Sequence, residues 1–239
     1  MSFTEIKKCR VCGSTHLNVA LDLGVQYLSG IFPKNINKEM PHAPLKLMQC
    51  DASSGGCGLV QLSGTYDLEE MYGDNYGYRS GLNNQMISHL KNKADKIIST
   101  YCNSEKNIIL DIAGNDGTFL GFFPDNYKRL SIDPSSHKFS KYFADGVDYI
   151  SEFFSDELFI NKFDEKKADV VTSFSMFYDL DDPCDFACQV KNILNPDSGV
   201  WVLEQSYMPE MLRVNSFDTV CHEHLSYYGI SQLKYIMDK

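Results

Sequence analysis

The stretch NIILDIAGNDGTFLGFF, residues 107–123, constrains the fold of this chain more than any other feature. It has the pattern of a buried strand over Ile108–Ile112, then a tight turn that contains Gly114 and Gly117, and then the start of a helix. Glycines let the backbone approach a ligand closely, and a helix N-terminus presents free amides. The stretch therefore predicts a strand, a ligand-binding turn and a helix in succession.

The same order of elements continues along the chain. In RLSIDPSS, residues 129–136, a short predicted strand ends at an acidic residue, Asp133. In nucleotide-binding α/β folds, an acid at this position accepts hydrogen bonds from the ribose hydroxyls. Further strands are predicted over residues 147–150, 168–174 and 199–205. A helix within residues 182–195 presents an inner face of Phe186, Val190 and Ile193. This alternation predicts an α/β fold, with a parallel sheet covered by helices and a ligand beyond the carboxyl ends of the strands.

Four of the eight cysteines form two pairs within the first 65 residues. Cys9 and Cys12 are separated by two residues, Cys50 and Cys57 by six, and Gly13 and Gly58 directly follow the second member of each pair. Four thiolates fill a tetrahedral zinc site, so the zinc would be structural. The DASSGG insert is longer than usual for such sites, and four unrelated cysteines are the alternative. Residues 1–65 are predicted to form a small β-rich zinc module, with LNVALDL and YLSGIF as strands and turns and KEMPHAPLKLMQC as a connection.

Residues 66–104 connect this module to the α/β part. YGDNYGYRSG has no regular period, so it is either a loop packed by its own rings or a segment whose tyrosine hydroxyls contact a substrate. The following residues have helical spacing, with Leu82, Met86, Leu90, Ile97 and Ile98 on one side.

Composition excludes several classes of protein. The chain is 43% hydrophobic and 23% charged, which is typical of a globular protein. A net charge of −10 argues against a nucleic-acid partner. Neither a membrane-spanning run nor a signal peptide is evident, which predicts a cytoplasmic protein without a membrane partner.

The segment CHEHLSYY, residues 221–228, has three interpretations from the residues alone: a metal site, a catalytic base or a polar turn. His222 and His224 lack the spacing of the H-E-x-x-H zinc motif. Imidazole titrates near neutral pH and can act as a base.

The turn D-I-A-G-N-D-G-T lacks the third glycine of dinucleotide-binding proteins, and it resembles motif I of class I methyltransferases that use S-adenosylmethionine (SAM). The whole chain resembles one family of these enzymes, the sugar C-methyltransferases that act on nucleotide-linked keto-deoxysugars. Five motifs carry the resemblance in order: the four-cysteine module, YGYRSG, the D-I-x-x-N-D-G-T turn, FFS-x-E-L at residues 153–158, and HEH. The family implies a class I methyltransferase fold, SAM, structural zinc and a nucleotide-sugar substrate.

The resemblance also implies roles for individual residues. His224 would be the general base that forms an enolate, with Glu223 and His222 as partners in the site. Two departures stand out: Cys221 replaces a tyrosine that is thought to steady the enolate oxygen, and Tyr178 and Asp179 stand where a histidine is expected. Either stabilisation of the enolate comes from Tyr76, Tyr78 or Tyr178, or the reaction differs from the best-known one of the family. The implied cofactor residues are Asp111, Ala113, Gly114, Asn115, Asp116, Gly117, Asp133 and Ser175.

Residues 105–239 are thus predicted to form the SAM-binding domain, truncated by two strands and a further domain relative to the family. Two other functions stay open. One is methyl transfer to oxygen or nitrogen of another small molecule. The other is a zinc-ribbon interaction module attached to an inactive α/β domain.

Overall fold

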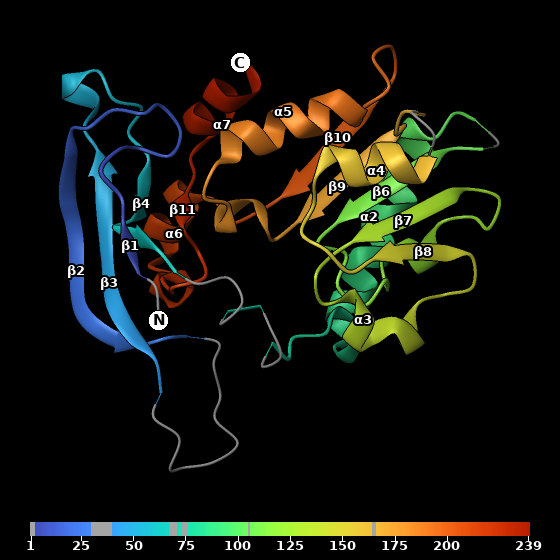
Figure 1. Cartoon of the computed structure of the whole chain (residues 1–239), viewed down its shortest axis with the longest axis horizontal. Coiled ribbons are helices and arrows are strands. Elements are labelled where there is room, and N and C mark those ends of the chain that lie inside the picture. The colour runs from blue at the N-terminus through green and yellow to red at the C-terminus, as the bar shows by residue number, and fades with distance from the viewer. Residues whose placement is uncertain (1–2, 30–39, 67–70, 73–75, 105, 164–165) are drawn as a thin grey trace. The chain divides into compact units, whose positions relative to one another are not determined.

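The computed structural model describes residues 3–29, 40–66, 71–72, 76–104, 106–163 and 166–239 (Figure 1). The chain forms two compact units that are discontinuous in sequence. The first unit comprises Met1–Tyr76, Met176–Ala187 and Gln205–Lys239, and the second comprises Gly77–Ser175 and Cys188–Glu204. These units cut across the predicted ranges 1–65, 66–104 and 105–239, because the HEH segment groups with the N-terminal residues.

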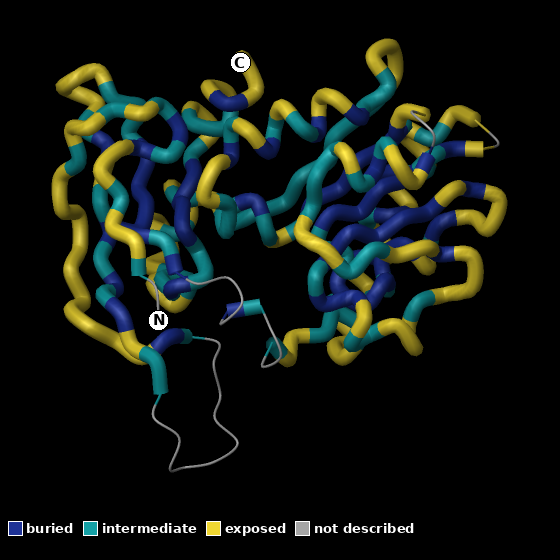
Figure 2. The backbone as a smooth tube through the Cα atoms, viewed as in Figure 1, coloured by how far each residue is buried: buried dark blue, intermediate teal, exposed yellow. Residues whose placement is uncertain are grey.

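The second unit is built on a parallel sheet of five strands in the order β10-β9-β6-β7-β8. The strands are β6 (Ile108–Ile112), β7 (Lys128–Ile132), β8 (Val147–Ile150), β9 (Val170–Phe174) and β10 (Val200–Glu204). All five coincide with predicted strands. The central strands are buried on both faces, as parallel sheets require, and are dark blue in Figure 2. This is the strand order of the class I methyltransferase fold, which confirms the predicted fold class.

Helices complete the second unit. They are α2 (Asn84–Tyr101), α3 (Ser136–Phe139) and α4 (Asp156–Phe163), while α5 (Pro183–Ile193) contributes residues to both units. Leu90, Ala94 and Ile97 of α2 pack with Ile109 and Val170 of the sheet, so α2 covers one sheet face. Val190 and Ile193 of α5 are fully buried, as predicted. Leu82 was predicted on the inner face of α2 but is 69% exposed, because the helix begins only at Asn84, after the turn η2 (Ser80–Leu82).

One predicted element of the second unit is wrong. The glycine turn is followed by the single 3-10 turn η3 (Leu120–Phe122) and not by an α-helix. Phe119 and Phe123 flank this turn, are buried and stack edge to face, with ring centroids 5.1 Å apart. Pro124 follows directly, and the residue before a proline is disfavoured in helical conformation. The turn therefore lacks the long helix whose N-terminus was expected behind it.

The first unit contains an antiparallel sheet in the order β11-β4-β3-β2. The strands are β2 (Leu17–Tyr27), β3 (His42–Cys50), β4 (Val60–Leu62) and β11 (Ser226–Tyr227), and β1 (Thr4–Glu5) pairs separately with β5 (Gly64–Thr65). The β-rich module was predicted, but its Pro-containing connection is largely strand β3. Pro44 is tolerated there opposite Val25, where β2 has an irregular register.

Alternate residues of β3 face the core of the first unit. Ala43, Leu45 and Leu47 are buried, together with Leu225 and Tyr227 from the C-terminal region. Strand β2, at the sheet edge, is exposed along nearly its whole length and is drawn in yellow in Figure 2. Helices α6 (Met208–Val214) and α7 (Ile230–Met237) and the 3-10 turns η1 (Ala52–Ser54), η5 (Phe177–Asp179) and η6 (Phe217–Thr219) complete this unit. No helix among the described residues is both long and apolar enough to cross a membrane.

Candidate active site

The glycine turn, residues 111–117, has an unusual backbone conformation. Ala113 and Asn115 have φ values of 58° and 53°, and Gly117 has a φ of 72°. Left-handed conformations of non-glycine residues are uncommon and cluster at functional sites. A Cβ atom on Gly114 would lie 2.5 Å from the Ser131 hydroxyl and 2.7 Å from Oδ2 of Asp111, so only glycine fits there. Gly114 therefore lets the turn pack closely against Asp111 and Ser131.

Two buried carboxyl groups support this turn. Asp111 accepts a hydrogen bond of 2.6 Å from the Thr172 hydroxyl, and burial raises the pKa of Asp111 to about 7 against the effect of that hydrogen bond. Asp133 follows β7; its Oδ2 accepts the Asn115 amide at 2.9 Å, and its Oδ1 accepts the amide and hydroxyl of Ser135. Each oxygen of a carboxylate accepts about two hydrogen bonds, so Oδ2 of Asp133 can accept one more.

The side chains of Asn115 and Asp116 bind the YGYRSG segment instead of pointing to solvent. Oδ1 of Asn115 accepts the Ser80 amide at 2.9 Å, and its Nδ2 donates to the Tyr78 carbonyl. Asp116 is fully buried and accepts hydrogen bonds from the Arg79 guanidinium and the Gly81 amide. Sequence alone does not predict this link between two motifs; its only trace there is an arginine in one motif and an acid in the other.

Ser175 and Tyr78 are the other predicted site residues in the second unit. Ser175 directly follows β9, is exposed and has a φ of 53°, and its amide donates to the Glu204 carbonyl at 2.7 Å. Tyr78 is 51% exposed. Three of the four non-glycine residues with positive φ in the described chain, Ala113, Asn115 and Ser175, thus belong to the predicted cofactor set.

His224 lies in the first unit, and one of its two ring nitrogens forms a hydrogen bond. Its Nδ1 is 2.8 Å from the Thr219 carbonyl, which can only accept, so the neutral ring carries its proton on Nδ1 and keeps a lone pair on Nε2. Burial lowers the pKa of His224 below its usual value, which favours this neutral form. The Tyr178 ring packs against the imidazole with centroids 4.2 Å apart.

His222 has a different environment, with both ring nitrogens engaged. Its Nε2 is 3.3 Å from the Ala43 carbonyl, so Nε2 donates, and its Nδ1 accepts from the Ser29 amide. The Ser29 hydroxyl donates to Glu223 at 2.7 Å. The ring of His222 is almost fully buried and holds the segment that carries Glu223, which leaves it no lone pair for proton transfer.

Cys221 stays a neutral thiol. Burial, with Glu223 nearby, raises the pKa of Cys221 to about 12. Tyr76 is the last residue of the N-terminal segment of the first unit, and its ring centroid lies 5.5 Å from that of Tyr72. The first unit thus brings His224, Glu223 and Tyr178 together with Cys221, while Tyr76 is connected through Tyr72.

The four predicted zinc ligands also come together. The sulfur atoms of Cys9, Cys12, Cys50 and Cys57 all lie within 4.8 Å of one another and form no disulfide. The Cys9–Cys57 and Cys12–Cys50 pairs are each 3.5 Å apart. A Zn–S bond of about 2.3 Å places the sulfurs of a tetrahedral site about 3.8 Å apart, so the cluster fits zinc. Hydrogen bonding with Cys57 lowers the pKa of Cys9 to about 5 against the effect of burial, and thiolate is the form that binds metal.

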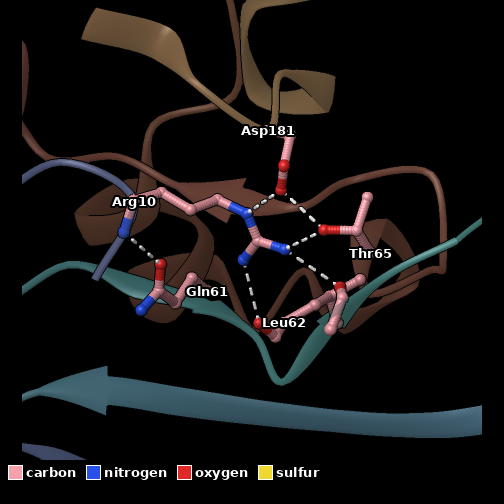
Figure 3. A network of polar contacts seen from close by, with 6 residues as sticks. Arg10, Gln61, Leu62, Thr65 and Asp181 are labelled. Carbon is pink, nitrogen blue, oxygen red and sulfur yellow. Dashed lines mark hydrogen bonds and ion pairs between the residues drawn. The ribbon is translucent and has the colours of Figure 1, made fainter. Parts of the chain in front are cut away.

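Arg10, between the first two cysteines, is the centre of a buried polar network (Figure 3). Its guanidinium donates to the carbonyls of Leu62 and Gly64, to the Thr65 hydroxyl and to Asp181, all at 3.0–3.1 Å. Its amide donates to the Gln61 side chain. The cysteine knuckle is thereby connected to β4, β5 and the segment after η5.

Two family models match this chain. A zinc binding domain matches residues 9–72, and a methyltransferase domain matches residues 85–239. This order is the predicted one, and it agrees with the cofactor predictions of structural zinc and SAM. A curated relative, the C-methyltransferase NovU of Streptomyces niveus, is 25% identical over 236 residues, covering 95% of this chain and 54% of the relative. The chain thus spans about half the length of that relative.

Two solved structures are similar to part of this chain. The plantazolicin methyltransferase BpumL in complex with SAH has a TM-score of 0.49 at 13% identity, covering 64% of this chain and 61% of the other. The cyclopropane synthase MmaA2 of Mycobacterium tuberculosis has a TM-score of 0.46 at 15% identity, covering 62% and 68%. The second family model alone covers more than half of the sequence, and the chain therefore belongs to the methyltransferase domain family.

Proposed function

We propose that this chain transfers the methyl group of SAM to a carbon atom of a nucleotide-linked keto sugar, with His224 as the general base. The observation that carries the proposal is the hydrogen bond from Nδ1 of His224 to the Thr219 carbonyl. It fixes the tautomer whose free lone pair is on Nε2, and the lowered pKa keeps that lone pair available at neutral pH.

The proposed reaction has two steps. Nε2 of His224 takes a proton from the carbon next to the ketone, and the electrons of the broken C–H bond form a carbon–carbon double bond and an enolate oxygen. The enolate carbon then forms a bond to the methyl group as the bond from methyl to sulfur breaks, which leaves S-adenosylhomocysteine. The imidazolium returns its proton to water. Glu223 stabilises the imidazolium, since its charge favours the protonated ring.

The glycine turn is the proposed binding site for SAM, which supplies an electrophilic methyl group when bound. The turn around Gly114, which packs closely on Asp111 and Ser131, is proposed to hold the methionine part, and Oδ2 of Asp133 keeps an acceptor site for a ribose hydroxyl. Asn115 and Asp116 are proposed to act through the backbone, because their side chains bind residues 78–81. Carbon as the methyl acceptor is supported by similarity to a C-methyltransferase.

Solvent exchange tests the base. The protein is incubated in D2O with S-adenosylhomocysteine and a thymidine-diphosphate 4-keto-6-deoxyhexose, and deuterium next to the ketone is measured by NMR. The unaltered chain is expected to catalyse exchange, and His224→Gln to slow it by about 100-fold or more, since general bases typically contribute about 100- to 10,000-fold. His16→Gln, which changes an exposed histidine of the same unit, is the control. Exchange that survives in His224→Gln would refute the role.

Calorimetric titration with S-adenosylhomocysteine tests the cofactor site. Asp133→Ala is expected to weaken binding, whereas Asp148→Ala, which removes an exposed carboxylate of the same unit, is expected to leave it unchanged. Absence of binding to the unaltered chain would favour an inactive α/β domain with a zinc interaction module. If S-adenosylhomocysteine binds, the chain is then incubated with SAM and a small-molecule acceptor; methylation of oxygen or nitrogen, seen by NMR of the product, would instead establish the other class of methyltransferase.

A further inference from the structure

The YGYRSG segment is held against the glycine turn through its backbone. Oδ1 of Asn115 accepts the Ser80 amide at 2.9 Å. Oδ2 of Asp116 accepts the Gly81 amide, also at 2.9 Å. A Cβ atom on Gly81 would lie only 2.7 Å from that same Oδ2, so the segment passes very close to the turn. These contacts fix the point on the backbone from which the Arg79 side chain extends.

The guanidinium of Arg79 is fixed as well, but most of its donors are unused. Its Nη1 donates to Oδ2 of Asp116 at 3.1 Å, and its Cζ lies 3.9 Å from the centroid of the Tyr142 ring. Stacking on a ring uses the face of a guanidinium, whereas its five N–H groups lie in its plane. Nε and Nη2 have no hydrogen-bond partner among the described residues. Neither is one of the buried unpartnered atoms, so both are accessible to a ligand.

Asp116 holds the arginine and is itself closed to a ligand. It is fully buried, its Oδ1 accepts the Thr118 amide at 3.1 Å, and its Oδ2 already accepts from Arg79 and Gly81. Only 16% of the Arg79 side chain is exposed. An arginine that is already ordered loses little further conformational freedom on binding, and its planar fork matches a carboxylate. The arrangement therefore suits recognition of an anionic group beside the turn.

SAM carries one anionic group, the carboxylate of its methionine part, beside a cationic ammonium and a cationic sulfonium. The acids of the site, Asp111 and Asp133, suit the cationic groups and the ribose, and neither would attract a carboxylate. We propose that Arg79 binds the carboxylate of SAM through its accessible N–H groups. This inference rests on the proposed function and adds to it the residue that recognises the charged end of the cofactor. Asn115 connects the two ends of the site, since its amide donates to Asp133 and its side chain holds Ser80.

Calorimetric titration with two ligands tests the contact. The first ligand is S-adenosylhomocysteine, and the second is its decarboxylated analogue, which lacks only the carboxylate. Arg79→Gln is expected to weaken binding of the first by about tenfold to 100-fold, the range for losing a hydrogen bond to a charged group. Binding of the second is expected to stay unchanged. Lys141→Gln is the matched control, because Lys141 is exposed and its Nζ lies 5.0 Å from the centroid of the same Tyr142 ring; it should alter neither affinity.

The outcomes separate this inference from the proposed function. No binding of S-adenosylhomocysteine by the unaltered chain would overturn both. Equal weakening of both ligands by Arg79→Gln would overturn the carboxylate contact alone, because an arginine that only holds the segment in place would affect both ligands alike. Equal affinity of the unaltered chain for the two ligands would also overturn it. That last measurement needs no substitution, so it decides the question even if Arg79→Gln does not fold.

Discussion

The guanidinium of Arg10 donates from Nε to Oδ1 of Asp181 at 3.1 Å, although 171 residues separate the two in sequence. Only 3% of the Arg10 side chain is exposed, while Asp181 is 66% exposed. A buried arginine fork satisfies several backbone carbonyls at once, which a lysine cannot do. The contact therefore ties the cysteine knuckle to the segment that carries Tyr178 and Asp179.

Arg10→Met should destabilise the chain strongly. The substitution leaves the carbonyls of Leu62 and Gly64 without donors, so the free energy of unfolding should fall by about 2–4 kcal/mol. Urea unfolding followed by circular dichroism measures the change. Arg213→Met is the control, because Arg213 is 70% exposed and its one ion-pair partner among the described residues is Glu210; its effect should stay within about 0.5 kcal/mol. Equal effects of the two substitutions would contradict a structural role for the network.

Zinc should leave the protein when one of its ligands is removed. Cys12→Ser should reduce the zinc content of the purified chain, measured by plasma mass spectrometry, from about one ion per chain to nearly none. Thermal stability should fall with it, because metal binding contributes folding free energy. Cys188→Ser changes an exposed cysteine and should alter neither quantity. Full zinc occupancy in Cys12→Ser would show that the cluster is not the binding site.

Gly114→Ala should abolish binding of S-adenosylhomocysteine. The added Cβ would overlap the Ser131 hydroxyl and the Asp111 carboxyl, which forces the turn to move. Gly121→Ala is a matched control in the same region, since its Cβ would meet the nearest atom only at 3.6 Å. Calorimetry is expected to show no binding for the first variant and unaltered binding for the second. Normal affinity in Gly114→Ala would show that the ligand binds elsewhere.

The affinity for SAM should depend on pH through Asp111. Because its pKa is raised to about 7, this carboxyl is largely neutral at pH 6 and largely ionised at pH 8. The ionised form favours a cationic ligand, so affinity should rise up to about tenfold as pH increases over this range. Asp111→Asn should remove the dependence. A pH profile that is the same in both proteins would assign the titration to another group.

Deuterium exchange should also depend on pH. The acidic part of its pH–rate profile reports on His224. Only neutral His224 can accept a proton, so exchange should fall as pH decreases through the pKa of His224. Burial lowers that pKa below the ordinary histidine value, so the midpoint should lie below about 6.5 and the rate should be level at neutral pH. An acid limb centred above pH 7 would implicate a different base.

The sheet of the second unit was predictable because each strand is a short apolar run that ends in polar residues. The signals are local ones: the Ile108–Ile112 run and the acid Asp133 after the next strand. In the structure, the run forms β6 and Asp133 directly follows β7. The missing helix after the glycine turn shows the limit of such signals. Phe119 and Phe123 were compatible with a helix face, but their burial around a 3-10 turn depends on the core that they enter.

Contacts between distant residues were beyond sequence reasoning. His222 and His224 are separated by one residue and have the same side chain, yet Ala43 and Ser29 occupy both ring nitrogens of the first, while Thr219 leaves one nitrogen of the second available.

Strand β11 pairs with β4, so the sheet that contains Cys50 takes its last strand from residues 226–227, far along the sequence. During synthesis, the cysteines leave the ribosome long before Ser226 and Tyr227 do. Until then, β4 is an unpaired edge strand of the N-terminal sheet. Pairing of strands so far apart in sequence closes a long loop, and this slows folding. Early metal capture would keep that edge ordered until its partner arrives.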